Sequence, residues 1–185
     1  MTLAEFLRQN RGRFPRRGTV GVETDWLHLC DIESSTGCLW AGDPYLANEE
    51  DGCVLSVPVG SYRVEVKGVD YSGSQFLSRL RVFLSSAAPV SVGPQVGEAG
   101  TDSAQIAVCD IRAFDAAAGN DNDAVQARIE SEVQRGYGVF SLGGASMAFV
   151  PSGLGDGTGP VFSLLHDRTP VGMELEFIEP GAPFE

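Results

Sequence analysis

Residues 146–178 read SMAFVPSGLGDGTGPVFSLLHDRTPVGMELEFI and contain three strand-like runs, at 146–150, 160–166 and 170–178. The first two runs flank a glycine-rich link at 151–159, in which Asp156 stands between two glycines. So many residues without a Cβ are needed only where the backbone adopts unusual φ/ψ angles or passes close to another segment. The link therefore predicts a shaped loop that carries a carboxylate at its tip.

The second and third runs predict a β-hairpin. Residues 167–170, which read DRTP, suit a four-residue loop built around a type I turn. In the register that this loop implies, Leu164 lies opposite Met173, and Phe162 lies opposite Leu175. The acidic side chains expected to point to solvent from the third run are Glu174 and Glu176.

Two further runs, at 62–70 and 76–84, show the same alternation and are joined by turn residues at 72–74. The side chains expected to face the core are Tyr62, Val64, Val66, Phe76, Leu80, Val82 and Leu84. Those expected to face water are Arg63, Glu65, Lys67, Arg79 and Arg81. A symmetric hairpin places Glu65 opposite Arg81, and such a pair supports a sheet by roughly a few tenths of a kcal/mol. We interpret this face as a solvated surface and not as a site.

Short runs and frequent turn signals continue over the rest of the chain. Further strands are predicted at 19–32, 38–41, 53–57, 104–109 and 137–142, with a short strand at 90–92 inside the Pro- and Gly-rich segment 85–101. Helices are predicted at 2–9 and 120–135, and a short helical turn at 111–118. Since strands and helices do not alternate, the sequence predicts a mainly β protein, an antiparallel sandwich or strongly curved sheet with two short helices packed on it.

The charge of the chain is strongly negative and uneven. The net charge is −12 over 185 residues, yet five of the 13 basic residues lie within the first 17 positions. We therefore divide the chain into an N-terminal helix and basic arm at 1–18 and a single β-rich domain at 19–185. The acidic domain is expected to repel nucleic acid and anionic membrane surfaces and to attract a basic protein partner.

The four cysteines are Cys30, Cys38, Cys53 and Cys109, and none lies in a Cys-x-x-Cys pair, which disfavours zinc. We expect them to be small buried apolar side chains, and a Cys30–Cys38 bridge remains open if the compartment is oxidising. No apolar run approaches the length of a membrane span, and the N-terminus lacks a secretory signal pattern. These features predict a cytoplasmic protein.

Residue patterns that would identify a reaction are lacking. His28 and His166 are the only histidines, and each is expected to lie in the core or at its rim. The chain contains no Gly-x-Ser-x-Gly nucleophile motif, phosphate-binding loop or EF-hand spacing. No catalytic residue and no cofactor are predicted.

Three aspartates at predicted strand ends remain as candidates for chemistry. They are Asp43, Asp110 and Asp156. If their loops converge, their oxygens could bind a hard cation. Alternatively, each could cap a turn by accepting backbone N–H bonds, and this is the interpretation that we favour.

Five segments together resemble a group of uncharacterised bacterial domains of unknown function. The segments are Gly42-Asp-Pro44, 57–66 (VPVGSYRVEV), 106–110 (IAVCD), 151–157 (PSGLGDG) and 171–177 (VGMELEF). The likeness extends from about residue 38 to residue 178 and leaves out the basic arm. It implies a β-rich cytoplasmic domain without an assigned catalytic residue. Some small acidic domains of this kind resemble immunity partners of bacterial toxins.

Two functional hypotheses follow, from different classes. The first is a non-catalytic acidic module that binds a basic protein partner, such as a toxin that it neutralises. The alternative is a small metal-dependent hydrolase or ligand-binding enzyme that uses the strand-end aspartates Asp43, Asp110 and Asp156. A purely structural or oligomeric role for the sheet edges is a third possibility, and the sequence does not predict an oligomeric state.

Overall fold

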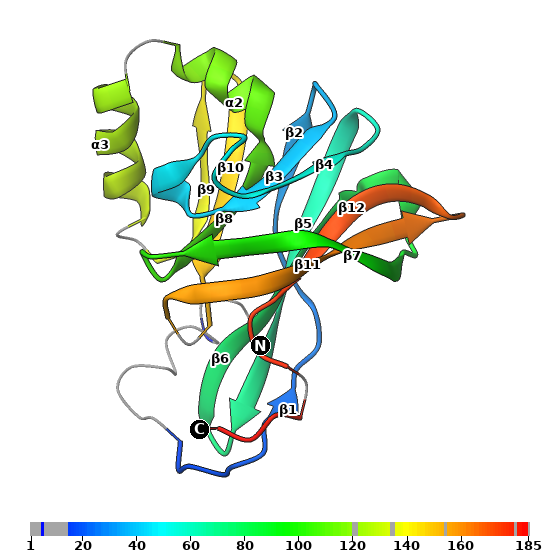
Figure 1. Cartoon of the computed structure of the whole chain (residues 1–185), viewed down its shortest axis with the longest axis vertical. Coiled ribbons are helices and arrows are strands. Elements are labelled where there is room, and N and C mark those ends of the chain that lie inside the picture. Colours follow the sequence, from blue (N-terminus) through cyan, green and yellow to red (C-terminus); the bar gives the residue numbers. More distant parts are fainter. Residues whose placement is uncertain are drawn as a thin grey trace.

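The computed structural model describes residues 5, 15–119, 122–133, 136–153, 155–179 and 181–184, with the side chains at 122–124 and 133 left out of that description. More than half of these residues lie in strands, which form two antiparallel sheets accompanied by the two helices described below (Figure 1). The predicted fold class, a mainly β protein of sandwich or curved-sheet type, is confirmed. The predicted helix at 2–9 and most of the basic arm lie outside the described residues, apart from helical Glu5.

The larger sheet has seven strands in the order β1-β5-β6-β12-β11-β7, and β2 also pairs with β5. Its strands are β1 (Val22–Glu23), β2 (Leu27–Ser34), β5 (Gly60–Tyr71), β6 (Ser74–Leu84), β7 (Ser91–Thr101), β11 (Gly157–His166) and β12 (Thr169–Glu176). The predicted strand at 19–32 is therefore two strands, separated by an irregular segment around Asp25 and Trp26.

The smaller sheet has five strands in the order β4-β3-β8-β10-β9. Its strands are β3 (Cys38–Gly42), β4 (Cys53–Ser56), β8 (Gln105–Asp110), β9 (Gly138–Leu142) and β10 (Ala145–Pro151). Helices α2 (Ile111–Ala118) and α3 (Asn122–Val133) pack on its outer face, where Phe114 and Ile129 contact the cluster around Trp40 (Figure 1). Two short 3-10 turns, η1 (Pro44–Leu46) and η2 (Ser85–Ala87), complete the elements.

The main core lies between the two sheets. Tyr62, Val64 and Val66 of β5 are fully buried there, as the alternation in the sequence predicts. They share one apolar cluster with Ile106 and Val108 of β8 in the opposite sheet. Each sheet thus buries one face against the other, at roughly 25 cal/mol for each Å² of apolar surface removed from water.

The β5–β6 hairpin follows the predicted register in its first part, with Glu65 paired to Arg81. A β-bulge between Lys67 and Gly68 then shifts the pairing by one residue. As a result Leu77 enters the main core, whereas Phe76 does not. The prediction for Phe76 was therefore wrong, because a bulge exchanges the two faces of a strand and leaves no mark in the hydrophobic pattern.

The β11–β12 hairpin differs from its predicted register by one residue. The turn consists of Asp167 and Arg168 alone, with φ of 48° and 68°, and both residues are left-handed as a two-residue type I′ turn requires. Met173 is paired with Ser163 and Leu175 with Val161. The shorter turn and a bulge between Leu164 and Leu165 together explain the difference.

Strand β7 is longer than predicted. The Pro- and Gly-rich segment was expected to hold only a short strand at 90–92, but β7 extends over eleven residues. It pairs with β11 alone, so it is an edge strand, where Pro94 removes no needed donor. A Cβ at Gly97 would lie 2.8 Å from the Cys53 sulfur, so glycine here permits close approach of the two sheets.

The cysteine prediction holds for three of the four residues, since Cys38, Cys53 and Cys109 are buried. Cys30 is half-buried, and all four are free thiols, so no Cys30–Cys38 bridge is present. Burial raises the pKa of Cys30 to about 12, which makes its thiol a poor nucleophile. Among the described helices, none has both the length and the apolar character needed to cross a membrane.

Replacement of Gly172 by alanine is expected to destabilise the fold by about 2 kcal/mol, because an added Cβ overpacks the β6–β12 contact. That Cβ would meet the Val82 carbonyl oxygen and lie 2.6 Å from the Phe83 Cα, and neither backbone atom can move alone. Urea denaturation measures the change. Gly100→Ala is the matched control, since the nearest atom to its Cβ would be the Thr158 hydroxyl oxygen, at 3.0 Å, and the nearest backbone atom, the Gly157 carbonyl oxygen, would lie at 3.5 Å. Equal midpoints for the two variants would contradict the packing argument.

Candidate functional site

Asp43 is a buried turn cap. It follows β3 and precedes η1, where Pro44 occupies the first helical position. One carboxylate oxygen accepts the Tyr45 N–H at 2.9 Å and the Ser103 hydroxyl at 3.0 Å. The other accepts the Thr101 hydroxyl and the N–H groups of Asp102 and Ser103, each at 2.9 Å. Burial acts to raise the pKa of Asp43, but these bonds outweigh it and hold the pKa below its ordinary value.

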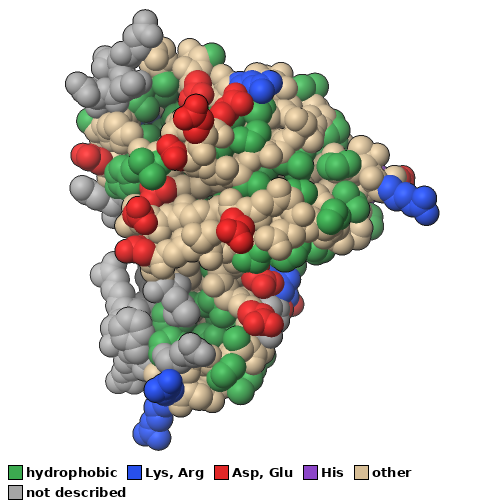
Figure 2. Space-filling view, in the orientation of Figure 1, with side chains coloured by type: hydrophobic (Ala, Val, Ile, Leu, Met, Phe, Trp, Pro, Cys, Tyr) green, Lys and Arg blue, Asp and Glu red, His purple; other side chains and the backbone are tan. Residues whose placement is uncertain are grey.

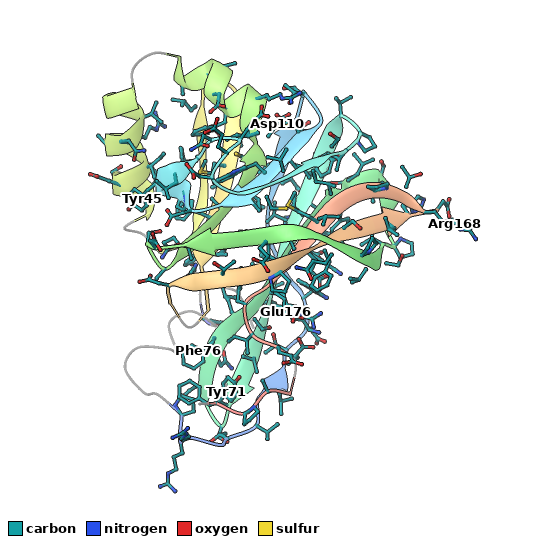
Figure 3. The ribbon with its side chains drawn as sticks, in the orientation of Figure 1. Tyr45, Tyr71, Phe76, Asp110, Arg168 and Glu176 are labelled. Atoms are coloured by element: carbon teal, nitrogen blue, oxygen red, sulfur yellow. The ribbon has the colours of Figure 1, made fainter. Side chains whose placement is uncertain are left out.

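Asp110 has the same role at the start of α2 (Figure 3). One of its oxygens accepts the Thr36 hydroxyl and the Ala113 N–H, the latter at 3.2 Å. The other accepts the Ser34 hydroxyl at 2.9 Å and the Thr36 N–H at 2.7 Å. The side chain therefore ties the β2–β3 turn to the helix N-terminus. Burial opposes ionisation, yet the bonds from Thr36, Ser34 and Ala113 lower the pKa of Asp110 below its ordinary value.

Asp156 is exposed on the loop between β10 and β11, as predicted from its glycine neighbours. The structure does not join it to the other two aspartates as a ligand set. Among all the described residues, no three His, Cys, Asp or Glu side chains are placed to share a metal ion. The metal-site hypothesis for Asp43, Asp110 and Asp156 is thus not supported, because the first two carboxylates are already used by turn N–H and hydroxyl groups.

The two histidines do not form a catalytic arrangement with each other. His28 contacts Asp31, at 3.2 Å, and 42% of its side chain is exposed. His166 lies 3.2 Å from the Pro89 carbonyl oxygen and 3.7 Å from Asp167, with 40% of its side chain exposed. Both are rim residues with separate partners.

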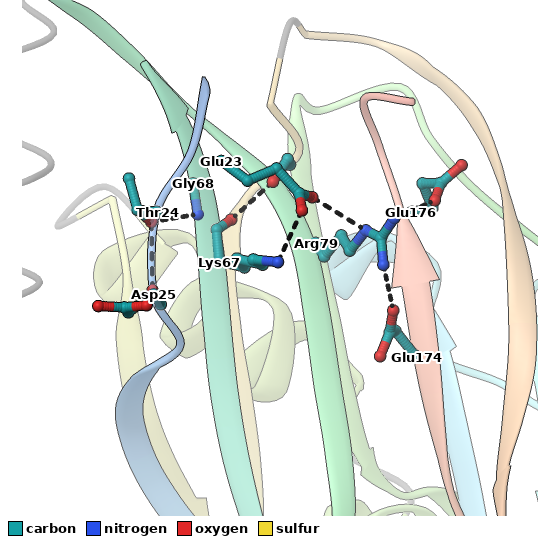
Figure 4. Close-up of polar contacts among 9 residues, drawn as sticks. Glu23, Thr24, Asp25, Lys67, Gly68, Arg79, Glu174 and Glu176 are labelled. Carbon is teal, nitrogen blue, oxygen red and sulfur yellow. Dashed lines mark hydrogen bonds and ion pairs between the residues drawn. The ribbon is translucent and has the colours of Figure 1, made fainter. Parts of the chain in front are cut away.

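A row of charged side chains crosses the outer face of the larger sheet, with Arg79 at its centre (Figure 4). Arg79 lies 2.9 Å from Glu174 and 2.9 Å from Glu176 of β12, and 3.4 Å from Glu23 of β1. Glu23 also contacts Lys67 of β5 at 2.6 Å. We call these five residues the charged row.

The expectation that this face is solvated was wrong. The Glu174 side chain is only 4% exposed and that of Arg79 only 19%, because long side chains from four strands cover one another. Burial raises the pKa of Glu174, and Arg79 counteracts that shift. Beside the row, Arg81 pairs with Glu65 at 2.8 Å and stacks 3.9 Å from the Trp26 ring centroid. The positive and negative side chains of this face of the sheet pair with one another, so the face presents little net charge to a partner.

Three hollows of the described surface adjoin one another through shared lining residues, and we call them together the acidic groove. The helix trough, about 430 Å³, lies between η1, α2 and α3. The middle hollow, about 300 Å³, shares Leu46 with the trough. The loop hollow, about 180 Å³, shares Thr101, Gly157 and Thr158 with the middle one and reaches the glycine-rich loop at Asp156.

Carboxylates line the acidic groove along its length. They are Asp43, Asp51, Glu98, Asp102, Asp115 and Asp156. Apart from the capped Asp43, all are exposed, and no described lining residue is Lys or Arg. Figure 2 shows acidic side chains gathered on this face, with the basic side chains in view toward its margins. Burial is the main cause that raises the pKa of Asp115, and the negative charge of Glu49 adds to it.

The sequence predicts one end of the acidic groove, the loop that carries Asp156, but not the rest of it. The glycine-rich loop and Asp156 were singled out, but the acidic groove also needs η1, the turn after β7 and both helices. Leu46 is 49% exposed between the two larger hollows, and a lone leucine in an acidic loop gives no signal that it lies beside a trough. Comparison with known proteins adds no assignment: no family model matches the chain, and neither a characterised protein nor a solved structure shows a significant match.

Proposed function

We propose that this protein is a non-catalytic module that binds a basic protein partner through the acidic groove. The observation that carries the proposal is the set of exposed carboxylates that line three adjoining hollows, in whose described lining there is no Lys or Arg. The carboxylates of the charged row, by contrast, are paired with Arg79 and Lys67.

The negative charge of this surface favours association with a cationic partner. A chain with a net charge of −12 attracts a cationic partner over about one Debye length, roughly 8 Å at physiological salt. Steering of this kind raises association rates well above the uncharged range of about 10⁵–10⁶ M⁻¹s⁻¹. The finer proposal is that the partner is a basic toxin that the module neutralises, which follows from the likeness to small acidic immunity domains.

Reversal of Glu98 and Asp102 to lysine is expected to weaken binding of a short lysine homopeptide about tenfold at low salt, since each exposed charge contributes up to about 1 kcal/mol. The matched control reverses Asp25 and Glu33, which are also exposed and lie outside the groove lining. Both variants change the net charge equally. Isothermal titration at several salt concentrations measures the affinities.

The two variants separate a localised surface from a general charge effect. A greater loss in the groove variant supports the proposal, and the difference is expected to shrink as salt rises. Equal losses in both variants would mean that binding follows net charge alone, and the groove would then have no special role. The same pair of variants serves as bait and control for isolating the natural partner.

A further inference from the structure

Asp156 and Gly157 form one of the two Asp-Gly steps in the chain, and the other is Asp51–Gly52. An aspartate that precedes glycine is prone to isomerise spontaneously, because glycine has no side chain to shield its backbone nitrogen from the neighbouring carboxyl group. Both aspartates are exposed and both are followed by glycine, so exposure and local sequence alone predict similar reactivity. The contacts of the folded protein distinguish the two steps.

The Asp51–Gly52 step is restrained on both sides of the reacting bond. The Asp51 carboxylate accepts the Asn48 side-chain NH₂ group at 2.7 Å, and the Asn48 side-chain oxygen accepts the Asp51 N–H at 2.9 Å. An added Cβ on Gly52 would meet the Trp40 indole nitrogen and lie 2.6 Å from the Ala41 carbonyl oxygen, so the backbone here packs against β3. Ring closure at Asp51 would have to break the Asn48 bonds and shift a packed glycine.

The Asp156–Gly157 step lacks such restraints. Among the described residues, none forms a hydrogen bond or an ion pair with the Asp156 side chain. A Cβ added at Gly155 or at Gly157 would meet nothing within 4 Å, so there is free space on both sides of the aspartate. Gly157 is the first residue of β11, opposite Thr101, and strand ends open locally at little cost. The carboxyl group and the nitrogen that follows it can therefore approach each other.

We infer that Asp156–Gly157 is a modification site, at which aspartate converts spontaneously to isoaspartate while Asp51–Gly52 is protected. The Gly157 nitrogen attacks the Cγ of the neutral Asp156 carboxyl group. A C–N bond forms, a C–O bond breaks, and one water molecule leaves with the amide proton. A second water molecule opens the resulting succinimide at the main-chain carbonyl of residue 156, which leaves the nitrogen bonded to Cγ. The two steps need no oxidant, reductant or cofactor.

The modification changes one end of the acidic groove without changing its final charge. Asp156 lines the loop hollow. Isoaspartate retains one carboxylate but adds one methylene group to the main chain, which displaces that carboxylate and lengthens the loop before β11. The inference goes beyond the proposed function and does not depend on it.

Incubation of the full-length protein at physiological temperature and mildly acidic pH, followed by peptide mapping, tests this inference. Mass spectrometry that distinguishes isoaspartate from aspartate measures both steps in the same sample. In the folded protein, Asp156 is expected to convert at least about tenfold faster than Asp51, because the Asn48 bonds must break before Asp51 reacts. In urea the two rates are expected to agree within about threefold, since only the local sequence then distinguishes the two steps.

Two variants identify the signal and its cause. Asp156→Glu keeps the charge but needs a larger ring for the same attack, so it is expected to lose the loop signal while Asp51 is unchanged. Asn48→Ala removes both restraining bonds and is expected to raise the conversion of Asp51 severalfold without changing that of Asp156. Thermal unfolding midpoints confirm that both variants fold.

The comparison between the two steps decides the inference. Equal rates in the folded protein, or a faster reaction at Asp51, would overturn it. A preference for Asp156 that persists unchanged in urea would do the same, because it would then belong to the local sequence and not to the fold. An Asp51 rate that Asn48→Ala leaves unchanged would contradict the protection assigned to Asn48.

Discussion

Asp110→Ala is expected to lower the free energy of unfolding by about 4 kcal/mol, because it removes the acceptor of four hydrogen bonds at a 1% exposed site. The Thr36 and Ala113 N–H groups lose their partner along with two hydroxyls. The β2–β3 turn is then no longer tied to α2. Urea denaturation of the variant beside the wild type measures the loss.

Asp110→Asn tests the charge and the geometry of the same contact. Each carboxylate oxygen accepts one backbone N–H, from Ala113 on one side and from Thr36 on the other. An asparagine in either orientation therefore points its NH₂ group at a backbone donor. We expect Asp110→Asn to lose about 2–3 kcal/mol, even though its shape is nearly that of aspartate.

The pH dependence of the free energy of unfolding provides a second measurement, whose direction can be predicted. The pKa of Asp110 in the folded protein lies below the ordinary value of 3.8, so its contribution is complete above 3.8 and is lost as the pH falls through the lower folded value. Asp43 behaves likewise. Each group contributes a slope of up to about 1.4 kcal/mol per pH unit in that window. The Asp110 variants are therefore expected to lose less stability than the wild type on acidification.

Asp102→Ala is the control for this series, since it removes an exposed carboxylate on the neighbouring turn and is expected to change stability by less than about 0.5 kcal/mol. A pH profile of the Asp110 variants parallel to that of the wild type would contradict the depressed pKa. Near-native stability of Asp110→Ala would show that the four contacts contribute little to the fold.

Much of the fold follows from local patterns in the sequence. Period-two alternation located Tyr62, Val64 and Val66 on the buried face, and it also gave the Glu65–Arg81 pairing. The strand ending at Asp110 and the helix after it were both predicted, because an apolar run followed by a capping residue is a local signal. The favoured capping roles of Asp43 and Asp110 are likewise confirmed by their hydrogen bonds.

The features that were missed depend on contacts between distant residues. The bulges in the β5–β6 and β11–β12 pairings each shift the register by one residue, which no alternation rule detects. The glycines and Pro94 of β7 led to the prediction of a loop. An edge strand can contain proline, and the close approach of β7 to Cys53 requires glycine. The acidic groove needs five segments brought together by the fold, and its parts look like ordinary polar loops in sequence.

Burial of the charged row could not be predicted for the same reason. Glu174 has the outward position that alternation gives it, and it pairs with Arg81 in the strand ladder. It is nevertheless 3% exposed, because side chains from β1 and β6 lie over it and around it. The position of a residue in a strand determines on which face of the sheet its side chain lies, whereas the exposure of that side chain depends on the size of the neighbouring side chains.

Arg79→Met is expected to cost about 3 kcal/mol at neutral pH, because removal of one partner from a largely buried ion cluster leaves the others uncompensated. Arg79 contacts Glu174, Glu176 and Glu23, so three carboxylates lose their shared cation. Methionine retains much of the apolar stem, which limits the part of the loss due to packing. Chemical denaturation at pH 7 measures the total effect.

The electrostatic origin of this loss predicts its response to pH and to rescue. The pKa of Glu174 is already raised by burial, and without Arg79 it rises further, so the variant regains stability as the pH falls and the carboxyl group becomes neutral. Glu174→Leu in the Arg79→Met background is expected to recover part of the loss at pH 7, since a well-packed apolar pair can replace a buried ion pair. Arg79→Lys keeps the charge but reaches fewer of the three carboxylates, and an intermediate loss is expected. A deficit that stays constant between pH 7 and pH 4.5, and that the second substitution does not reduce, would assign the role of Arg79 to packing and not to charge.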